Sequence, residues 1–541
     1  MRAMRSDSAP VGRAIPEDSE IPALVRSTPA AGHHRGAILL AAVATMGSLL
    51  FGYDTGVIAG ALPYMYLPNV AGGLSLDAVT EGFVTAALAL GAAFGAVIGG
   101  HITDRIGRRA NILLLSFIFI VGTVGCTFSV SVWMLYPFRF ILGWAVGSAS
   151  STVPLYLSET APKRIRGPLV AVDQFMIVFG QFVAYAMNAV IARMHSGPQV
   201  TIANDPSGTY HSGDVVSWDI VKTLTDVTVS GGNGTAWRWM LILATIPAIA
   251  LWVGMRMMPE SPRWFAANER FLEAIGTLKQ VRTDDGEVID EIREMADLRR
   301  AEADNPSEEA WTLRRAWKIR WTRRIIIIGV FLGIFDQTTG INTAMWYMPK
   351  ILHSAGFSTT DSISLNVVTG LVSAIGSAIG FILIAKFMRR HVGMFQEGGI
   401  VVSLLILAGI FAFGIEPYMS ADGEISSAIP AWLPWSVLVV ISLFVFIKQS
   451  CTIHWVILSE IFPATIRGAS QGICVGTLWV FNGIVAFVFP VMMQYLGGSW
   501  TYLIFALINV AAFLFYWKVV PETKNYSLEE IEANLEAKYS A

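Results

Sequence analysis

Asp54 is a carboxylate within an apolar run of the sequence. The run begins near Ile38 and ends with the glycine-rich stretch 47–62, in which Asp54 is the one charged residue. An ionisable side chain at membrane depth is costly, and it commonly marks a proton or substrate pathway. The chemistry it offers is reversible protonation, and the plainer alternative is a carboxylate that only forms hydrogen bonds inside a helix bundle. We expect a proton-binding site in a transporter.

The sequence has no residue set typical of an enzyme or of a metal centre. The three cysteines, Cys126, Cys451 and Cys474, fall in apolar runs without disulfide or zinc spacing. We find no nucleophile elbow and no metal-spaced histidines, and an isolated His454 is more often a packing or hydrogen-bonding residue than a catalyst. The net charge of −2 gives no electrostatic case for nucleic acid. We therefore expect no enzyme activity, no cofactor, no metal and no nucleic-acid partner.

Asp54 must be positioned by membrane-spanning helices. With 54% apolar and 14% charged residues, the chain is unlike an ordinary soluble domain. A span needs about 20 mostly apolar residues, and twelve stretches meet that test. The predicted spans are 38–62, 83–103, 110–129, 133–156, 168–192, 239–258, 325–348, 365–385, 395–415, 435–458, 470–493 and 501–520. The composition predicts an all-α membrane protein.

The distribution of Lys and Arg predicts the orientation of the chain. The loops after the second, fourth and eighth spans are basic, whereas the connections 63–82, 416–434 and 497–500 contain neither Lys nor Arg. Basic loops stay in the cytoplasm. We expect a multi-pass protein of the plasma (inner) membrane with both termini in the cytoplasm.

Five regions follow from these patterns. Residues 1–35 are rich in Pro, Ser and charge and lack a signal-peptide apolar core, which predicts a disordered cytoplasmic tail. The other regions are a first six-helix half at 36–258, a cytoplasmic helical linker at 259–324, a second half at 325–520 and a tail at 521–541. In the linker, 271–279 and 288–300 have the periodicity of short amphipathic helices, which either latch the two halves or form a solvated connection. The external loop 193–237 is unusually long, and such loops are functional or disordered.

The two halves repeat one another. The segment 157–167, Leu-Ser-Glu-Thr-Ala-Pro-Lys-Arg-Ile-Arg-Gly, recurs at 458–468 as Leu-Ser-Glu-Ile-Phe-Pro-Ala-Thr-Ile-Arg-Gly. Pro-Glu-Ser-Pro at 259–262 and Pro-Glu-Thr-Lys at 521–524 likewise follow the sixth span of each half. Internal repeats of six spans are typical of secondary transporters, whose binding site lies between the halves near the midplane.

Six motifs occur in order and resemble those of the sugar porter family of the major facilitator superfamily. They are Gly-His-Ile-Thr-Asp-Arg-Ile-Gly-Arg-Arg (100–109), Arg-Phe-Ile-Leu-Gly (139–143), Pro-Leu-Tyr-Leu-Ser-Glu (154–159) with Arg166-Gly167, Pro-Glu-Ser-Pro-Arg-Trp (259–264), Gln-Thr-Thr-Gly-Ile-Asn (337–342) and Pro-Glu-Thr (521–523). The resemblance covers nearly all of 47–531. It implies two pseudo-symmetric six-helix halves and a carrier similar to bacterial xylose, hexose and inositol–proton symporters.

The resemblance implies a gate of charged residues at the cytoplasmic ends of the spans. In the family, such acids and arginines pair between helices when the carrier is open outward and separate when it opens inward. Part of the arginine content serves topology alone. The candidate gating residues are Asp104, Arg108, Arg109, Glu159, Arg166, Arg389, Glu460 and Arg467.

A sugar site needs convergent hydrogen-bonding groups and an aromatic face. Amides offer donors and an acceptor without charge, and Trp offers an apolar face with one donor. Gln174 and Gln181 are seven residues apart and share one helix face. Hydrogen bonds between helices are the plainer role for such amides. The candidate substrate-binding residues are Gln174, Gln181, Asp336, Gln337, Asn342, Tyr347, Ser373, Trp455, Trp479 and Asn482.

Several positions depart from the family pattern. Asp336 stands where the seventh span usually has Gln, and it is a candidate for a second titratable group or for a strong acceptor to a polyol hydroxyl. Cys-Thr-Ile-His at 451–454 replaces a Gly-Pro-x-Pro pattern, and Ala385 and Met388 replace the acid and glycine of the second gate motif. These changes leave the exact sugar open.

In the family, an acid at the position of Asp54 accompanies proton symport, and Arg139 is its matched partner. We therefore predict a proton symporter, expected to be a monomer in the lipid bilayer, that imports a monosaccharide or cyclic polyol by alternating access. A facilitative uniporter and a non-transporting membrane sugar sensor are the alternatives. The short tail after Pro521 argues against a sensor.

Overall fold

A computed structural model describes residues 15–162, 165–224, 226–304, 317–419, 429–463, 466–524, 526 and 528–540. In these ranges, twelve helical segments are long and apolar enough to cross a membrane, as the hydropathy of the sequence predicts. The predicted all-α membrane architecture is confirmed, with one addition: a small sheet in the long loop of the first half.

The first half begins with a span made of two consecutive helices, α2 and α3, that carries Asp54. The helices of this half are α2 (Ala37–Ala44), α3 (Met46–Met65), α4 (Ala78–Ile106), α5 (Arg108–Thr127), α6 (Val132–Thr160), α7 (Arg166–Met194), α9 (Ala236–Ile242) and α10 (Thr245–Arg256). A short 3-10 turn, η1 (Asn69–Ala71), follows the first span.

The second half repeats this arrangement, with two of its spans broken. Its helices are α15 (Arg320–Thr338), α16 (Ile341–His353), α17 (Thr359–Lys386), α18 (Arg389–Gly409), α19 (Trp432–Ser450), α20 (His454–Glu460), α21 (Arg467–Tyr495) and α22 (Gly497–Lys518). The seventh span breaks at Gly340, whose φ of 86° is a left-handed value that favours glycine. The tenth span breaks between Ser450 and His454. After α18, the chain continues through a π-helical segment, η2 (Ile410–Ile415), and a 3-10 turn, η3 (Glu416–Tyr418).

Small residues let the helices of the first half approach closely. A Cβ atom added to Gly52 of α3 would lie 1.8 Å from the carbonyl oxygen of Ile177 on α7. Helix association in a membrane depends on such packing, because lipid tails offer no hydrophobic drive for helices to associate. The glycines around Asp54 thus fix α3 against α7.

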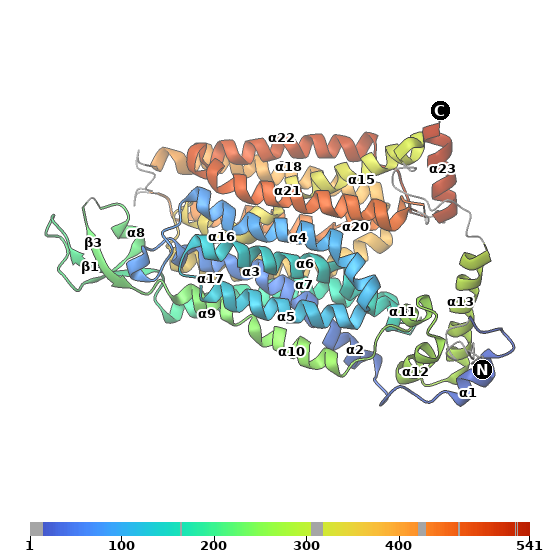
Figure 1. The fold of residues 1–541 in the computed structure, drawn as a ribbon. Coiled ribbons are helices and arrows are strands. Elements are labelled where there is room, and N and C mark those ends of the chain that lie inside the picture. Colours follow the sequence, from blue (N-terminus) through green and yellow to red (C-terminus); the bar gives the residue numbers. More distant parts are fainter. Residues whose placement is uncertain are drawn as a thin grey trace.

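The two halves lie side by side and contact each other through α4 with α21, α7 with α17, and α3 with α16. Figure 1 shows the second half, yellow to red, above most of the first half. It also shows both chain ends at one end of the bundle and the small sheet at the other. We call these the terminal end and the sheet end.

The long loop 193–237 folds around a three-stranded antiparallel sheet at the sheet end. The strands are β1 (Gln199–Asn204), β2 (Val215–Ser217) and β3 (Thr228–Gly232), in the order β2-β1-β3, with a short helix α8 (Trp218–Val221) after β2. Val200 pairs with Val216 on one side and with Gly232 on the other. Val200 and Ile202 alternate along β1 and are buried beneath the sheet, which gives the insert its own apolar core.

The linker forms helices at the terminal end, as predicted. They are α11 (Pro262–Ala267), α12 (Phe271–Val281) and α13 (Asp285–Asp304). The first tail departs from the prediction of disorder over 15–35, because α1 (Ile21–Ser27) buries Ile21 and Val25 in the apolar cluster of α12 and α13. Residues 1–14 lie outside the described part. In the second tail, α23 (Leu528–Ser540) buries Ile531 and Leu535 against α15.

Candidate functional site

Asp54 and Arg139 form a buried ion pair inside the first half. Asp54 lies on α3 and is 2% exposed; Arg139 lies on α6 and is 1% exposed. Nη1 of Arg139 is 3.4 Å from Oδ1 of Asp54, and its Nε donates to the carbonyl of Val84 at 3.4 Å. Oδ2 of Asp54 accepts no hydrogen bond from the described residues. A buried pair of this kind resists removal of one charge, because the other is then left unpaired.

Gln181 and Gln174 lie on α7 beside α3. Nε2 of Gln181 donates to Oγ1 of Thr55, one residue after Asp54, at 3.3 Å. Gln174 is exposed and neighbours Asp173, a fully buried acid that accepts a 2.5 Å hydrogen bond from Ser48 of α3. Sequence analysis did not single out Asp173, although it is a charge inside the fifth apolar run. Both amides therefore lie close to the span that carries Asp54.

In the second half, the predicted residues Asp336, Gln337 and Asn342 form one hydrogen-bonded chain at the break of the seventh span. Nε2 of Gln337 donates to Oδ2 of Asp336 at 2.8 Å, and Nδ2 of Asn342 donates to Oε1 of Gln337 at 2.5 Å. α15 and α16 are consecutive parts of one span, and these three side chains meet at the break around Gly340. Each amide keeps further donor or acceptor capacity for a ligand.

Asp336 is also an ion-pair partner, which the sequence analysis missed. Lys448 at the end of α19 contacts Oδ1 of Asp336, and Nδ1 of His454 at the start of α20 lies 2.8 Å from the same oxygen. Lys448 and His454 stand on either side of the break in the tenth span. Lys448 lies inside an apolar run of the sequence. Like Asp54, it is costly to bury at membrane depth and is therefore a candidate functional residue.

The remaining predicted substrate residues are dispersed over three spans. Trp455 follows His454 and is 40% exposed. Trp479 of α21 is buried with its ring 5.9 Å from that of Phe51 on α3, a contact between the halves. Ser373 and Asn482 are buried, and Oγ of Ser373 and Oδ1 of Asn482 have no partner within the described ranges. Unpartnered buried polar atoms of this kind are available for a hydrogen bond to a ligand or to water.

Tyr347 takes part in the contact between the halves at the sheet end. Its hydroxyl contacts Thr85 of α4 and donates to the carbonyl of Ala486 at 2.7 Å. Nearby, Nζ of Lys350 on α16 lies 2.5 Å from Oε2 of Glu81 on α4. These contacts join the two halves, so Tyr347 belongs to the closure of the sheet end as well as to the list of candidate ligands.

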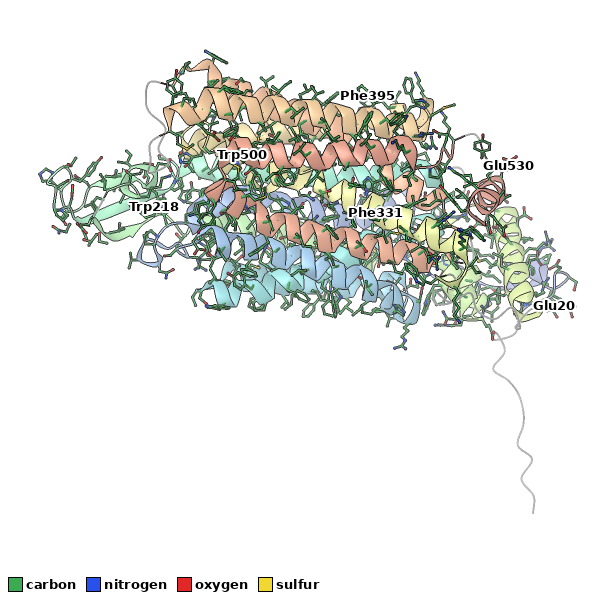
Figure 2. All side chains as sticks on the ribbon, turned by 90° about the horizontal axis from the view of Figure 1, so that it is seen from above. Glu20, Trp218, Phe331, Phe395, Trp500 and Glu530 are labelled. Atoms are coloured by element: carbon green, nitrogen blue, oxygen red, sulfur yellow. The ribbon has the colours of Figure 1, made fainter. Side chains whose placement is uncertain are left out.

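A cavity of about 540 Å³ lies at the sheet end. Its lining includes Glu81, Lys350 and Tyr347, and also Trp218 and Asp219 of the insert. Trp218 is labelled on the insert in Figure 2. The insert thus covers part of the surface next to the contact between the halves.

The predicted gate residues of the first half are paired at the terminal end. Arg108 of α5 donates to Glu159 of α6 at 2.9 and 3.1 Å, and it pairs with Asp104 at 3.1 Å. Glu159 also accepts a 2.5 Å hydrogen bond from Ser261. Arg109 donates from Nε and Nη2 to the carbonyls of Met255 and Arg256 at the end of α10.

The second half repeats this network with one change. Arg389 pairs with Glu460 at 3.3 Å, and Glu460 accepts a 2.5 Å hydrogen bond from Thr523. No acid follows the pattern of Asp104, and Nζ of Lys524 instead donates to the carbonyl of Ala385 at 3.1 Å. The side chains of Arg166 and Arg467 lie outside the described residues.

The repeated Pro-Glu motifs have a structural role that the sequence did not reveal. Glu260 accepts the backbone N–H of Arg109 at 2.8 Å, and Glu522 accepts those of Arg389 and Arg390 at 3.0 Å. In both halves, a carboxylate therefore caps the N-terminus of the third span, α5 or α18, where unpaired N–H groups and the helix dipole favour negative charge.

The ion pairs at the terminal end join helices of the same half. Among the described residues, Glu159 and Glu460 form ion pairs with arginines of their own half, whereas Glu81 and Lys350 link the two halves at the sheet end. Within the same ranges, no cluster of His, Cys, Asp or Glu could hold a metal ion. The arrangement is that of two helix bundles joined by polar contacts at the sheet end.

Comparison with known proteins agrees with this arrangement. The family model described as "Sugar (and other) transporter" matches residues 40–535. The chain is 39% identical to the putative metabolite transport protein YfiG of Bacillus subtilis, over 92% of each chain. It is 38% identical to the major myo-inositol transporter IolT of the same organism, over 92% of this chain and 93% of IolT.

The solved structure of the proton:xylose symporter XylE, of the major facilitator superfamily and bound to 6-bromo-6-deoxy-D-glucose, aligns with a TM-score of 0.66. That alignment has 27% identity and covers 92% of this chain and 99% of XylE. These relatives are transporters, so the prediction of a carrier rather than an enzyme is confirmed. The chain belongs to the sugar porter family of the major facilitator superfamily and is a multi-pass membrane transporter.

Proposed function

We propose that the protein is a proton symporter that imports a monosaccharide or a cyclic polyol by alternating access. The observation that carries the proposal is the buried pair of Asp54 and Arg139, a titratable acid with one cationic partner and one free oxygen. The similarity to a myo-inositol transporter and to a proton:xylose symporter supports the substrate class and the coupling.

Protonation of Asp54 is the coupling step. A charged Asp54 holds Arg139 and thereby ties α3 to α6 within the first half. Protonation neutralises the carboxyl group of Asp54 and removes its electrostatic attraction to Arg139. It also lowers the free-energy cost of enclosing the site away from water. The carrier then closes around proton and sugar together, and reopening on the other side releases both.

The sugar occupies the space between the halves in this proposal. Gln174 and Gln181 contribute from α7 in the first half, and Gln337 and Asn342 contribute from the second. Trp455, which is partly exposed, supplies an apolar face for the ring. Ser373, Trp479 and Asn482 offer buried polar atoms without described partners, which suits a polyhydroxylated ligand.

Access alternates between the two ends of the bundle. The pair of Glu81 and Lys350 and the hydroxyl of Tyr347 close the sheet end. The basic terminal end is the cytoplasmic one by the positive-inside rule, and it contains both chain ends. The networks around Glu159 and Glu460 hold each half rigid there, so the halves rock as units.

The test is transport by an Asp54→Asn variant reconstituted in vesicles. With labelled myo-inositol, D-glucose and D-xylose as the panel, we expect the wild type to accumulate substrate when a pH gradient is imposed. Asp54→Asn is expected to lose accumulation while still exchanging the substrate across the membrane, because Asn keeps the shape but cannot bind the proton.

Asp290→Asn is the matched control, because Asp290 lies on the exposed surface of α13 far from the pair. Uphill accumulation retained by Asp54→Asn would overturn the coupling role of Asp54. If the wild type itself equilibrates the sugar without accumulating it under a pH gradient, the protein is a facilitative uniporter.

A further inference from the structure

Four ionisable side chains are buried together in the second half, away from the pair of Asp54 and Arg139. Asp336 of α15, Glu397 of α18, Lys448 of α19 and His454 of α20 are all nine-tenths or more buried, and Glu397 is 1% exposed. Glu397 and Lys448 belong to the ninth and tenth spans. Ionisable groups within a membrane span are functional candidates because their burial is costly.

Glu397 faces the interior of the second half. Phe395, two residues earlier on α18, projects from the outer surface and is 66% exposed (Figure 2). Two residues are rather more than half a helical turn of about 3.6 residues, so Glu397 points to the opposite side. On that side, α18 packs against α19, which carries the buried Lys448, so the charges of Glu397 and Lys448 can interact.

With a neutral imidazole on His454, the charges in this cluster do not balance, because the ammonium group of Lys448 faces two carboxylates. Lys448 is held by Asp336, which also has His454 at 2.8 Å. Glu397 accepts one hydrogen bond, from the neutral amide of Gln396 at 2.9 Å, and its Oε2 has no described partner. Among the described residues, no Lys, Arg or His nitrogen lies within ion-pair distance of Glu397. If ionised, Glu397 is a buried negative charge without a counterion, which is strongly unfavourable.

The other titratable groups around Glu397 do not supply the missing positive charge. Tyr516 of α22 packs against Gly393, about one turn before Glu397 on α18, and the buried thiol of Cys451 lies at the break of the tenth span. Both groups are neutral or negative. His454 already has an anionic neighbour in Asp336.

We propose that Glu397 holds a proton on its carboxyl group and is a second proton-binding site of the carrier, linked to the sugar site through Lys448, Asp336 and Gln337. The proton converts the carboxylate to a neutral acid and brings the cluster to charge balance. The O–H of the acid then serves as a donor, and water supplies the proton.

Lys448 connects this site to the substrate amides. When Glu397 releases its proton, two buried carboxylates compete for one ammonium group, and Lys448 is drawn away from Asp336. Asp336 accepts the amide of Gln337, which in turn accepts that of Asn342. The protonation state of Glu397 therefore changes how two proposed sugar ligands are held, a consequence that rests on the proposed function.

The first test measures the proton directly and does not depend on transport. Infrared spectra of the full chain in lipid are recorded in H₂O and D₂O for wild type and for Glu397→Gln. We expect the variant to lose the C=O stretch of one protonated carboxyl group. Glu416→Gln, a matched change at the other end of the same span and hydrogen-bonded to Ser499, is expected to keep that band.

Asp336→Asn tests the competition for Lys448 without altering Glu397. With the rival carboxylate removed, Lys448 is free to pair with Glu397, and we expect the protonated band to be replaced by a carboxylate band. A spectrum in which Glu397→Gln loses only a carboxylate band overturns the proposal. A protonated band that persists in Asp336→Asn overturns the link through Lys448.

The second test places Glu397→Gln in the Asp54→Asn background and follows sugar exchange at equal pH on both sides. Asp54→Asn alone is expected to retain a several-fold change of exchange rate with pH, and the double variant is expected to lose it. An unchanged pH profile in the double variant overturns the transport role of Glu397. The outcome for Asp54 is read separately, from accumulation by its single variant.

Discussion

Gln337 is a predicted substrate-binding residue whose side chain is held by hydrogen bonds at both ends of its amide. Its amide lies between the carboxylate of Asp336 and the amide of Asn342, so both of its ends are oriented before any ligand arrives. A side chain oriented in advance loses little conformational freedom when a sugar hydroxyl binds. In the proposed sugar site, Asp336, the acid that departs from the family pattern, therefore positions Gln337.

Replacement of this amide should reduce the affinity for sugar. Gln337→Leu removes the hydrogen-bond acceptor of Asn342 and the donor to Oδ2 of Asp336, and a buried polar group without a hydrogen bond costs about 1–3 kcal/mol. We expect the apparent affinity for the transported sugar to fall about tenfold or more. Competition binding in detergent measures it. Gln494→Leu, at an exposed position of the sheet end, is the control, and an unchanged affinity of Gln337→Leu removes Gln337 from the site.

At the scale of elements, the insert between the fifth and sixth spans contacts both halves. Asp219 of α8 accepts hydrogen bonds from Oγ1 and N of Thr359, at 2.8 and 3.3 Å, at the start of α17. Burial alone would raise the pKa of the Asp219 carboxyl. The charges of His353 and Lys222 and the hydrogen bonds from Thr359 outweigh burial and hold that pKa below its usual value.

This contact predicts how the stability of the protein depends on pH. The folded pKa of Asp219 lies below the unfolded value of about 3.9, so its contribution is present above that value and is lost as the pH falls through the folded pKa. Asp219→Asn should lower the free energy of unfolding by about 1 kcal/mol at neutral pH. Thermal unfolding in detergent should show that the difference in stability between Asp219→Asn and wild type disappears in acid. Asp214→Asn is the control. If the stability difference persists below the folded pKa of Asp219, the charge of its carboxylate does not stabilise the protein.

Single elements also show which parts of the fold the sequence could predict. The length of the apolar runs predicted the twelve spans, and the repeated motifs predicted the two halves. Both features are properties of contiguous residues. The partners of Asp336 come from a span more than a hundred residues away, and no local pattern encodes that distance. Lys448 and Glu397 were visible as charges in apolar runs, but their pairing was not. The strands of the insert were not predicted, although Val200 and Ile202 alternate along β1.

At the scale of the whole molecule, the two halves meet through polar contacts at the sheet end. Glu81 is fully buried, accepts a 2.6 Å hydrogen bond from Tyr66 of its own half and pairs with Lys350 of the other half. In the proposed alternating access, such contacts favour one arrangement by only a modest free energy, since they are broken in every transport cycle. The pair of Glu81 and Lys350 is therefore expected to affect the populations of the states open and closed at the sheet end more than the stability of the fold.

Removal of both charges together tests this balance without leaving one of them buried and unpaired. In Glu81→Gln/Lys350→Met, we expect the population open at the sheet end to rise up to about tenfold, the equivalent of about 1.4 kcal/mol. The readout is the rate at which an impermeant maleimide modifies Ala59→Cys, which lines the sheet-end cavity, from that side of the membrane. The native cysteines are buried and give a low background. Asp361→Asn, at the start of α17, is the control, and equal modification rates with and without the pair would show that it does not hold the halves together.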